Sequence, residues 1–386
     1  MPTDTESQTP GNLETLQTSH QDIFRRALAN LLSTDLAEYA YAQILDGLPT
    51  EESLLEGYVY MGGHPVFELN HTKLCEGFLD KARDFRARFD PCQLRFDDHA
   101  QINQLLQAFQ NTAPGSSDFN LRLIELVVVA VHQIAAYLYD LDDGAHKHQV
   151  FGDWLQQELA ASVLRSQPWI NSHGEWIPPA TFFHSAYVHP EQYPRGLADV
   201  AGYWAEGKIF GGVILFDRGE SEQEVWEHVH GQLSSILANA LQCKAMWIHG
   251  ARLRGPTTLY PPTSEQFDSL VGFLLSGPDD NVPCPLPIHG TRENRPRWDP
   301  WHALAQYHIF RDKYERYVSP EPPKRSLSHM APGDWPEMGD EWIIDSQDYI
   351  RSQGHNLTEE DIAAAYARLK EITPSSPLWR RWQHGH

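Results

Sequence analysis

The chain has 386 residues, of which 41% are hydrophobic and 11% aromatic, so it is long and apolar enough for one large or two ordinary globular domains. Its 52 acidic residues outnumber its 30 basic residues and give a formal net charge of −22. A surface of this sign repels phosphate backbones and anionic lipid, which argues against nucleic acid and membranes as partners. Small molecules and other proteins remain as partner classes, and the oligomeric state is left open.

The N-terminal segment and the cysteines bear on the cellular compartment. Residues 1–18 are predicted to form a disordered leader, because Met1–Gly11 is polar and lacks the basic and apolar segments of a signal peptide. The four cysteines form no CxxC pair and no tight cluster in the sequence, which is poor evidence for disulfides or a zinc site. They are Cys75, Cys92, Cys243 and Cys284. We therefore expect a cytoplasmic protein with free thiols.

Apolar residues at helical spacing recur through the first part of the chain, residues 19–168. The predicted helices cover about 20–46, 69–89, 98–109, 119–139 and 150–165. The first of them ends at Gly47-Leu48-Pro49, because proline cannot continue a helix. This first part is therefore expected to be mainly helical.

Residues 169–320 have a more β-prone character. We expect strands over about 181–188, 199–206, 209–217 and 245–253. Gly207-Lys208, between the second and third of these, suits a type II′ hairpin turn. Thr263-x-x-Gln266 has the spacing of a capping box and predicts a helix that runs to about Leu275.

The last part, residues 321–386, is predicted to be an irregular tail with one late helix over about 357–372, which Thr358 caps. Pro and aromatic residues are frequent over 283–340, and we expect this region to lie over the core without regular elements. Helices followed by hairpin-linked strands indicate an α+β fold. In this fold the helical N-terminal portion packs on an antiparallel sheet, with an irregular Pro- and Trp-rich C-terminal wrap.

The most informative feature is a polar stripe on the otherwise apolar helix at 119–139. Arg122, Glu125 and His132 fall on roughly one face of this helix, and buried charged groups must be paired or coordinated. About 10.5 Å along the helix axis separates Glu125 from His132, so a substrate or a metal ion between them is within reach of both. Glu125 and His132 are therefore the candidate catalytic residues. The alternative is a structural network, in which Arg122 or a basic group from the strand region pairs with Glu125.

Residue types that bind metals also gather around the strand predicted at 181–188. His184, His189 and Glu191, with a distant histidine such as His230 or His249, satisfy the loose form of an iron-binding triad of two histidines and a carboxylate. The chain has 20 histidines, so such matches also arise by chance. The sequence therefore identifies no cofactor.

A short segment, Asp140 to His148, gathers three carboxylates and two imidazoles at the end of the apolar helix. These ligands suit a divalent ion, and the aspartates resemble the metal-binding aspartates of class I terpene cyclases. The segment departs from the DDxxD spacing of that family, so a solvated helix end is the alternative. The sequence contains no G-x-S-x-G elbow, P-loop, dinucleotide fingerprint or HExxH motif, and whether the protein is an enzyme stays open.

Three segments together resemble a group of uncharacterised proteins from filamentous fungi. They are Tyr193–Glu206 with its GYWAE sequence, Ile209–Gly219 with IFGGVILFDRG, and the helix Glu125–Ala135. The resemblance implies a fungal source and carries no assigned activity. Secondary metabolism is the setting that it suggests.

Two functions from different classes fit these observations. The first is an intracellular tailoring enzyme of unknown reaction type that acts on a small apolar or aromatic metabolite. The second is a non-catalytic scaffolding or regulatory protein that binds a partner through an acidic, aromatic-rich surface. An enzyme predicts an enclosed cavity that touches Glu125 or His132 and the segment 184–206. A binding protein predicts that these polar groups are packed and paired, with exposed tryptophans elsewhere.

Overall fold

The structure is a computed structural model that describes residues 13–56, 63–94, 100–165, 180–219, 243–250, 255–316 and 333–384. It confirms an α+β fold, in which most elements are helices and a four-stranded antiparallel sheet packs against them. The helices are α1 (Thr18–Leu32), α2 (Asp35–Asp46), α3 (Glu51–Leu55), α4 (Pro65–Glu68), α5 (Phe78–Arg88), α6 (Ala100–Gln110), α7 (Ser117–Leu141), α8 (His148–Arg165), α9 (Leu197–Phe210), α12 (Ser264–Leu275), α13 (Pro300–Ala305), α14 (Glu337–Asp345), α15 (Gln347–Ser352), α16 (Glu359–Leu369) and α17 (Trp379–His384).

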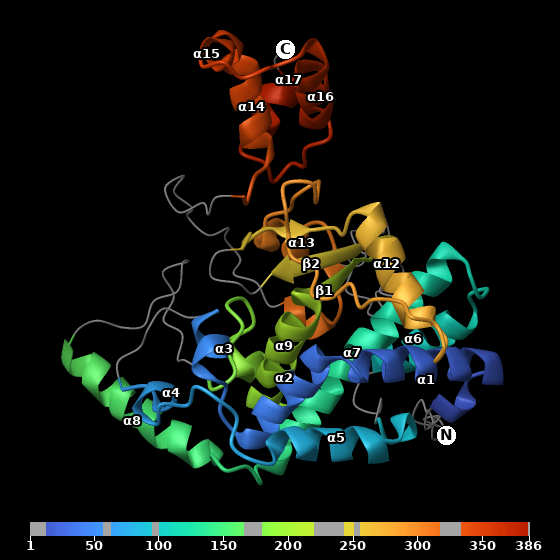
Figure 1. Ribbon diagram of the computed structural model, residues 1–386, viewed down its shortest axis with the longest axis vertical. Helices are drawn as coiled ribbons and strands as arrows, with labels where there is room; N and C mark the ends of the chain where they lie inside the picture. The colour runs from blue at the N-terminus through green and yellow to red at the C-terminus, as the bar shows by residue number, and fades with distance from the viewer. Residues whose placement is uncertain are drawn as a thin grey trace, which may run out of the picture.

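Short 3₁₀ segments and four strands complete the described elements. The 3₁₀ segments are η1 (Leu13–Thr15), η2 (Pro91–Gln93), η3 (Pro190–Gln192) and η4 (Lys313–Arg316), and the strands are β1 (Gly212–Asp217), β2 (Met246–Gly250), β3 (Leu259–Tyr260) and β4 (Ile309–Phe310). Figure 1 shows the sheet in the middle of the molecule, with α1, α2, α5 and α7 below it and α14 to α17 above it.

The N-terminal helices differ from the sequence expectation in two places. The helix predicted over 20–46 is two helices, α1 and α2, because the side chain of Thr34 accepts a hydrogen bond from the backbone N–H of Ala37 and starts a new helix. Gly47, at φ 98°, ends α2 as expected. The leader predicted over 1–18 is corrected at its end, because Leu13 in η1 is fully buried; residues 1–12 lie outside the described part.

Helix α7 is the central helix of the core. It packs against α9, α2, α6 and α1, and its side chains Leu126, Val127 and Val128 are fully buried. Each such side chain contributes roughly 1.5–3 kcal/mol to the free energy of unfolding. Among the described helices, α7 alone is long and apolar enough to span a membrane, but 78% of its most apolar window is buried inside the protein. The helix is therefore a core helix.

The hairpin predicted around Gly207-Lys208 is wrong, because residues 197–210 form helix α9. Eleven of the 14 residues of α9 are buried, and a segment with apolar residues on several faces has a pattern that does not separate a helix from a strand. Gly211, at φ 93°, ends this helix and leads directly into β1. Gly202 allows α7 to approach α9 closely, since a Cβ atom here would lie 2.6 Å from the ring of His132.

The sheet has the strand order β3-β2-β1-β4, with every neighbouring pair antiparallel. Residues of β1 alternate between two cores: Ile214 and Phe216 face the larger core with α7 and α9, and Val213 and Leu215 face a smaller core with Ile309 of β4. The strand predicted over 245–253 is confirmed over 246–250 as β2, and residues 251–253 lie outside the described part. The strand predicted over 181–188 is wrong, because residues 180–189 carry no strand.

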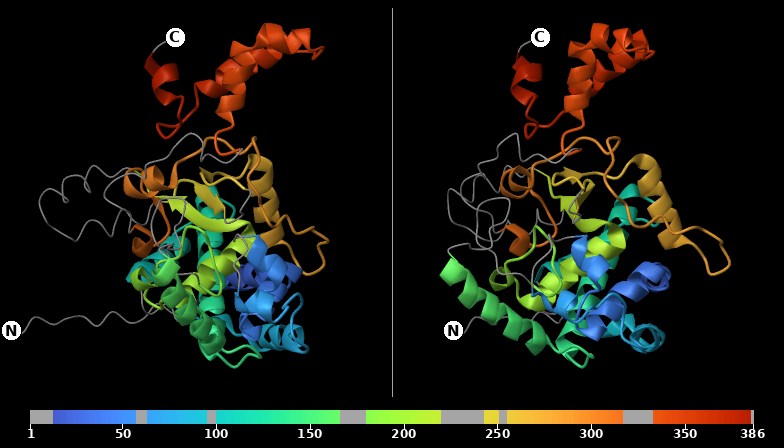
Figure 2. Two further views of the ribbon diagram at one scale, coloured as in Figure 1. Left: turned by 90° about the vertical axis from the view of Figure 1, so that its left-hand side faces the viewer. Right: turned by 60° about the vertical axis from the view of Figure 1, so that its left-hand side comes forward.

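The capping box predicted at Thr263 and Gln266 is present and starts α12. The C-terminal residues correct another expectation: the irregular tail predicted over 321–386 contains four helices in its described part, α14 to α17, and only α16 with its Thr358 cap was predicted. We call residues 333–384 the C-terminal unit. Figures 1 and 2 show that it stands apart from the other helices and touches the rest of the protein near α13.

Candidate functional site

Glu125, the first candidate catalytic residue, is buried and doubly paired. Its Oε2 accepts a hydrogen bond from Nη1 of Arg122 at 2.8 Å, and its Oε1 accepts one from Nη2 of Arg218 at 2.6 Å. Arg218 directly follows β1, so this pair joins the central helix to the sheet. The expectation that Glu125 is buried and paired is confirmed, with a partner on its own helix and a second partner from the strand region.

The guanidinium of Arg218 is held in place by the backbone as well as by Glu125. It donates hydrogen bonds to the carbonyl oxygens of Phe310 and Arg311, at 3.0 and 2.8 Å. Cys243 lies in the same environment, where burial and the negative charge of Glu125 raise the pKa of its thiol well above the ordinary value. The thiol is therefore protonated at neutral pH, which does not suit a nucleophile.

His132, the second candidate catalytic residue, lies between two carboxylates of α9. Its Nδ1 is 2.7 Å from Oε1 of Glu206, and its Nε2 is 3.2 Å from Oδ1 of Asp199. Burial lowers the pKa of His132, but the hydrogen bonds to Asp199 and Glu206 outweigh it and hold the pKa above its ordinary value. A ring that donates from both nitrogens is a charged imidazolium.

The two carboxylates that face His132 are held in their charged form. Burial alone raises the pKa of Asp199, and the hydrogen bond from His132 reverses this, so that its pKa is lowered. Burial likewise raises the pKa of Glu206, and the positive charge of Arg311 together with His132 lowers it below the usual range. The positive charges of His132 and Arg311 thus compensate the negative charges of Asp199 and Glu206.

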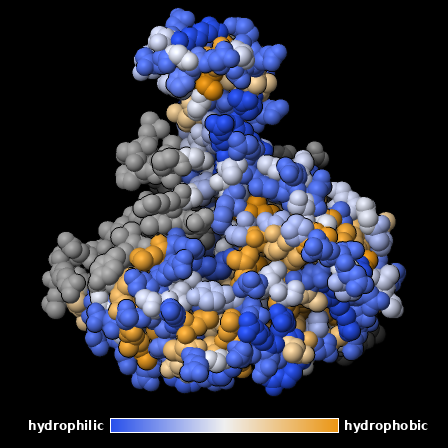
Figure 3. Space-filling view, viewed as in Figure 1, coloured by the Kyte–Doolittle hydropathy of each residue, from blue (hydrophilic) through white to orange (hydrophobic). Residues whose placement is uncertain are grey.

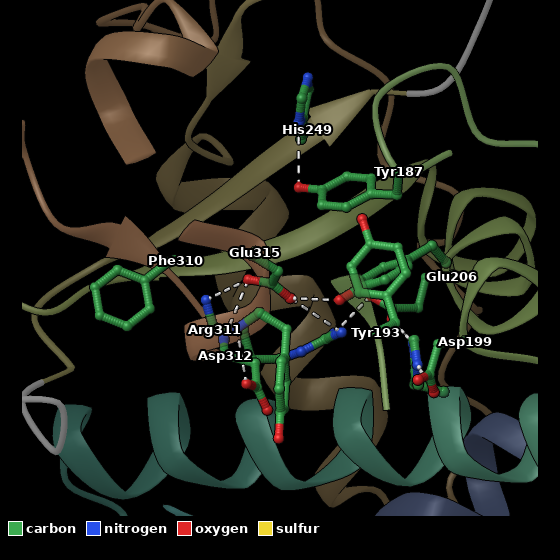
Figure 4. Close-up of polar contacts among 12 residues, drawn as sticks. Tyr187, Tyr193, Asp199, Glu206, His249, Phe310, Arg311, Asp312 and Glu315 are labelled. Atoms are coloured by element: carbon green, nitrogen blue, oxygen red, sulfur yellow. Dashed lines mark hydrogen bonds and ion pairs between the residues drawn. The ribbon is translucent and has the colours of Figure 1, made fainter. Parts of the chain in front are cut away.

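Arg311 and Glu315 extend this cluster toward the sheet. Nη1 of Arg311 donates to Oε2 of Glu206 at 2.7 Å, and Nη2 of Arg311 lies 3.4 Å from Oε1 of Glu315. Oε1 of Glu315 also accepts a hydrogen bond of 3.1 Å from the hydroxyl of Tyr203. Figure 4 shows Arg311 and Glu315 above α7, with Glu206 on the facing helix. We call His132, Asp199, Tyr203, Glu206, Arg311 and Glu315 the buried network.

Tyrosine rings connect the buried network to the strand-end histidines. The rings of Tyr187 and Tyr203 stack with their centroids 4.3 Å apart, and the hydroxyl of Tyr187 lies 3.2 Å from Nδ1 of His249 on β2. His184 lies beside them, with its ring centroid 6.0 Å from that of His249. Burial keeps the pKa of His184 well below its ordinary value, so its ring is neutral.

The proposed iron ligands do not converge among the described residues. His184 is fully buried beside His249, whereas His189 and Glu191 form their own pair at the surface, with 3.2 Å between Nδ1 and Oε1. In the described part of the chain, none of the three belongs to a cluster of metal-type ligands. His230 lies outside the described residues.

Two of the carboxylates at the end of α7 have partners that are not metal ligands. Asp140 pairs with Arg195, and Oδ1 of Asp142 accepts a hydrogen bond of 3.0 Å from the backbone N–H of His148. Asp140, Asp142 and Asp143 are all exposed. These contacts favour the solvated helix end over a shared metal site for the aspartates.

The sequence identified Glu125 and His132 as candidate site residues, but it did not identify their partners on α9 and near the sheet. Asp199 and Glu206 stand seven residues apart, a spacing that places both on one face of a helix, but the strand assigned to this segment hid the signal. Arg218, Arg311 and Glu315 lie outside any periodic segment of their own. Tertiary contacts alone bring Arg218 to Glu125 of α7, and Arg311 and Glu315 to side chains of α9.

A cavity of about 280 Å³ lies away from the buried network, at the end of β2. Its lining is mostly backbone, with Tyr260 and His289 as its large side chains. The lining residues are Gly211, Gly250, Gly255, Pro256, Tyr260, His289 and Gly290. Neither Glu125 nor His132 lines this cavity, so it is not the enclosed site that the enzyme hypothesis predicted.

No family model, no curated protein and no solved structure matches this chain. The resemblance to uncharacterised fungal proteins therefore stays a prediction, and the function is argued from the geometry alone.

Proposed function

We propose that this protein is a non-catalytic binding protein that recognises a basic protein partner through its C-terminal unit. The observation that carries this proposal is the set of large apolar side chains that the unit exposes. Trp342 and Tyr349 are 53% and 60% exposed, and Met338 and Tyr366 are each 41% exposed. Aromatic residues and methionine are enriched where proteins bind one another, and tryptophan and tyrosine are frequent hot spots.

The exposed apolar residues stand on short helices that are also acidic. Met338 and Trp342 are four residues apart on α14 and therefore share a face. The same unit carries six exposed carboxylates, of which the first pairs with Arg381 and the third with Arg351: Asp345, Asp348, Glu359, Glu360, Asp361 and Glu371. Figure 3 shows the unit as mostly hydrophilic, with a small hydrophobic group on the face in view. A partner with basic and apolar side chains complements both the acidic charge and the exposed apolar residues of the unit.

The paired state of the two candidate catalytic residues supports the same proposal. Both oxygens of Glu125 accept hydrogen bonds from arginines, and both ring nitrogens of His132 face carboxylates. A general base needs a free lone pair within reach of a substrate proton. Groups whose charges are paired with internal partners fit a structural network better than a catalytic pair.

The test compares two exposed aromatic residues in different parts of the protein. Partners are captured by crosslinking to the full-length protein in the cells that express it, identified, and re-bound as purified proteins. Trp342→Ala is expected to weaken the affinity for the purified partner at least about 30-fold, the effect of losing a hot spot of 2 kcal/mol. Tyr39→Ala, on α2 at 40% exposure, is the matched control and is expected to bind like the wild type.

A salt titration of the reconstituted complex tests the charge argument. The association rate is expected to fall as ionic strength rises, because the distance over which acidic and basic surfaces steer each other shrinks from about 30 Å at 0.01 M salt to about 3 Å at 1 M. Equal binding by Trp342→Ala and the wild type contradicts the proposal, as does a partner whose binding surface is acidic.

Small-molecule binding in the cavity at the end of β2 is a second candidate function. Its volume of about 280 Å³ is close to the lower limit of ligand pockets. Apolar and aromatic metabolites are the class to screen, by the rise in melting temperature that a ligand causes. Gly250→Ala places a methyl group 3.3 Å from the carbonyl oxygen of Pro256 and narrows the cavity, so a ligand bound there must lose affinity in this variant.

A further inference from the structure

Four side chains that the sequence analysis left unconnected meet at the end of α2. They are Asp46, His71, Cys75 and His146, and one potential ligand atom from each lies within 4.8 Å of those of the other three. They come from three separate segments: the last residue of α2, the connection between α4 and α5, and the connection between α7 and α8. From this convergence we infer that Asp46, His71, Cys75 and His146 form a binding site for one zinc ion.

Asp46 is the centre of the cluster. Its side chain is fully buried, which is costly for a carboxylate unless cations or donors surround it. Oδ2 of Asp46 lies 3.1 Å from Nε2 of His71, and Oδ1 lies 2.9 Å from Nδ1 of His146. The backbone N–H of Cys75 donates to Oδ2 at 2.8 Å. The carboxylate is therefore aimed at both imidazoles and held in a fixed orientation.

His71 is oriented as histidine ligands usually are. Its Nδ1 donates a hydrogen bond of 2.8 Å to the carbonyl oxygen of Pro49, since a carbonyl can only accept. This fixes the ring and directs Nε2 into the cluster. A backbone carbonyl that accepts from the second ring nitrogen is the usual partner of a metal-binding histidine, because it selects the tautomer that presents its lone pair to the ion.

The backbone holds the three segments together at short range. The N–H of His146 donates to the carbonyl oxygen of Asp46 at 2.8 Å, and the N–H of Glu51 donates to the carbonyl oxygen of His71 at 2.9 Å. Two glycines permit this approach. A Cβ atom on Gly47 would lie 1.6 Å from the carbonyl oxygen of His146, and one on Gly144 would lie 2.5 Å from that of Asp46.

The donor set selects zinc among the common metal ions. One thiolate, two imidazoles and one carboxylate make a tetrahedral set that zinc prefers, whereas calcium and magnesium take oxygen ligands. Zinc–ligand bonds of about 2.0–2.3 Å place the ligand atoms about 3.3–3.8 Å apart. The Asp46–histidine distances of 3.1 and 2.9 Å therefore have to lengthen slightly, and the widest separations, up to 4.8 Å, have to shorten by about 1 Å. Cys75 and His146 are half-buried, which leaves a path from solvent to the site.

Four protein ligands close the coordination sphere, so the ion would serve structure. It would fasten the end of α2 to the segments around His71 and His146, and thereby to the core helix α7. The site lies apart from the C-terminal unit and from the buried network, and the inference is independent of the proposed partner. The sequence signal was the pair His71-x-x-x-Cys75, which becomes meaningful only with the distant Asp46 and His146.

The test uses cobalt and zinc with the full-length protein, first stripped of metal by a chelator. Cobalt in this site is expected to show the strong visible bands of a tetrahedral ion and a thiolate-to-cobalt charge-transfer band, with saturation at one ion per chain. Cys75→Ser is expected to remove the charge-transfer band. Cys92→Ser, at a half-buried thiol that accepts a hydrogen bond of 3.0 Å from Arg25, is expected to keep it.

Zinc affinity, measured by competition with a chromogenic chelator, gives an independent readout. His146→Gln is expected to weaken zinc binding more than about 100-fold, because the loss of a ligand exceeds the 10–100-fold effect of an outer-shell change. His148→Gln, two residues along and outside the cluster, is expected to bind like the wild type. Zinc is also expected to raise the melting temperature of the wild type and of His148→Gln, but not that of His146→Gln.

Three results would overturn the inference. One is a wild-type protein without a charge-transfer band at saturating cobalt. Another is a band that survives Cys75→Ser and disappears in Cys92→Ser. The third is equal zinc affinity in His146→Gln and the wild type, which would mean that ions bind elsewhere. Because His146 is on a half-buried connection, its variant keeps the test decisive if Cys75→Ser does not fold.

Discussion

Glu125 on the central helix and Arg218 at the end of β1 form a hydrogen-bonded ion pair of 2.6 Å in which each side chain is only 4% exposed. Because Arg122 also pairs with Glu125, a single carboxylate balances two buried guanidinium groups. The pair is a connection between helix and sheet, and the loss of the Glu125 carboxylate removes an ion-pair partner from both guanidinium groups in the core.

The first prediction concerns this carboxylate. Glu125→Ala is expected to lower the free energy of unfolding by about 3–5 kcal/mol, the usual cost of removing one partner of a buried pair. Glu125→Gln is expected to lose less, because its amide oxygen still accepts from one arginine. Urea unfolding measures both.

A surface ion pair provides the control for Glu125. Glu359→Ala breaks the pair with Arg351, whose two side chains are 84% and 40% exposed, and is expected to change the stability by less than about 1 kcal/mol. If Glu125→Ala is as stable as the wild type, the pair does not stabilise the fold, and α7 becomes the first place to look for catalysis.

The second prediction concerns alkaline pH and His132. The pKa of His132 in the folded protein is raised above the unfolded value of about 6.5, so its contribution to stability is complete below that pH. The contribution is lost as pH rises through the folded pKa, because the ring then loses the proton that it donates to a carboxylate. The stability difference between the wild type and His132→Gln is therefore expected to shrink as pH rises above about 6.5.

Free energies of unfolding of the wild type and of His132→Gln, measured at several pH values, test whether their difference shrinks as pH rises. Asp199 and Glu206 stay ionised over this range, since their folded pKa values are lowered, so they do not contribute to the trend. A difference between wild type and His132→Gln that grows with pH would show that His132 is neutral between its two carboxylates.

The third prediction concerns His64, whose contribution to stability is expected to be lost as pH falls and not as pH rises. This ring is fully buried among aromatic rings, and burial lowers its pKa to about 4. A lowered histidine pKa contributes stability above the unfolded value of 6.5, and this is lost as pH falls toward the folded value. Relative to a variant that does not titrate, the wild type is expected to lose up to about 3 kcal/mol between pH 6.5 and 4.

His64→Asn is the suitable reference for this titration. Nδ1 of His64 accepts the backbone N–H of Val66 at 3.2 Å and caps α4, and asparagine is also a good cap. The variant is expected to be less stable at pH 7 and to approach the wild type as pH falls. Parallel curves for the two proteins would mean that His64 is accessible to protons in the folded state.

The fold class and the polar character of α7 could be predicted from the sequence, because long periodic helices and buried charges leave clear patterns. Helix α9 could not, since its apolar residues lie on several faces and give no clear helical period. Arg122, three residues before Glu125, was predicted as its partner, but the pairs Glu125–Arg218 and His132–Glu206 depend on tertiary contacts across 93 and 74 residues, which no local pattern encodes. The cluster of Asp46, His71, Cys75 and His146 was hidden for the same reason.

The last prediction concerns the attachment of the C-terminal unit. Asp340 on α14 is buried and pairs with Arg295 from the body and with Arg368 of α16, at 2.6 Å from the latter. It therefore holds the unit together and fastens it to the segment before α13. Asp340→Ala leaves the partly buried Arg295 without this anion, and the expected result is local opening of the unit while the core around α7 stays folded.

Limited proteolysis is expected to remove residues after about 333 faster than in the wild type, with the cut fragment retaining the main unfolding transition. Glu371→Ala, at an exposed position of the same unit, is the control and is expected to be cut at the wild-type rate. If Asp340→Ala instead lowers the stability of the whole protein in a single transition, the C-terminal unit and the core fold as one cooperative body, and the ion pair is part of that body.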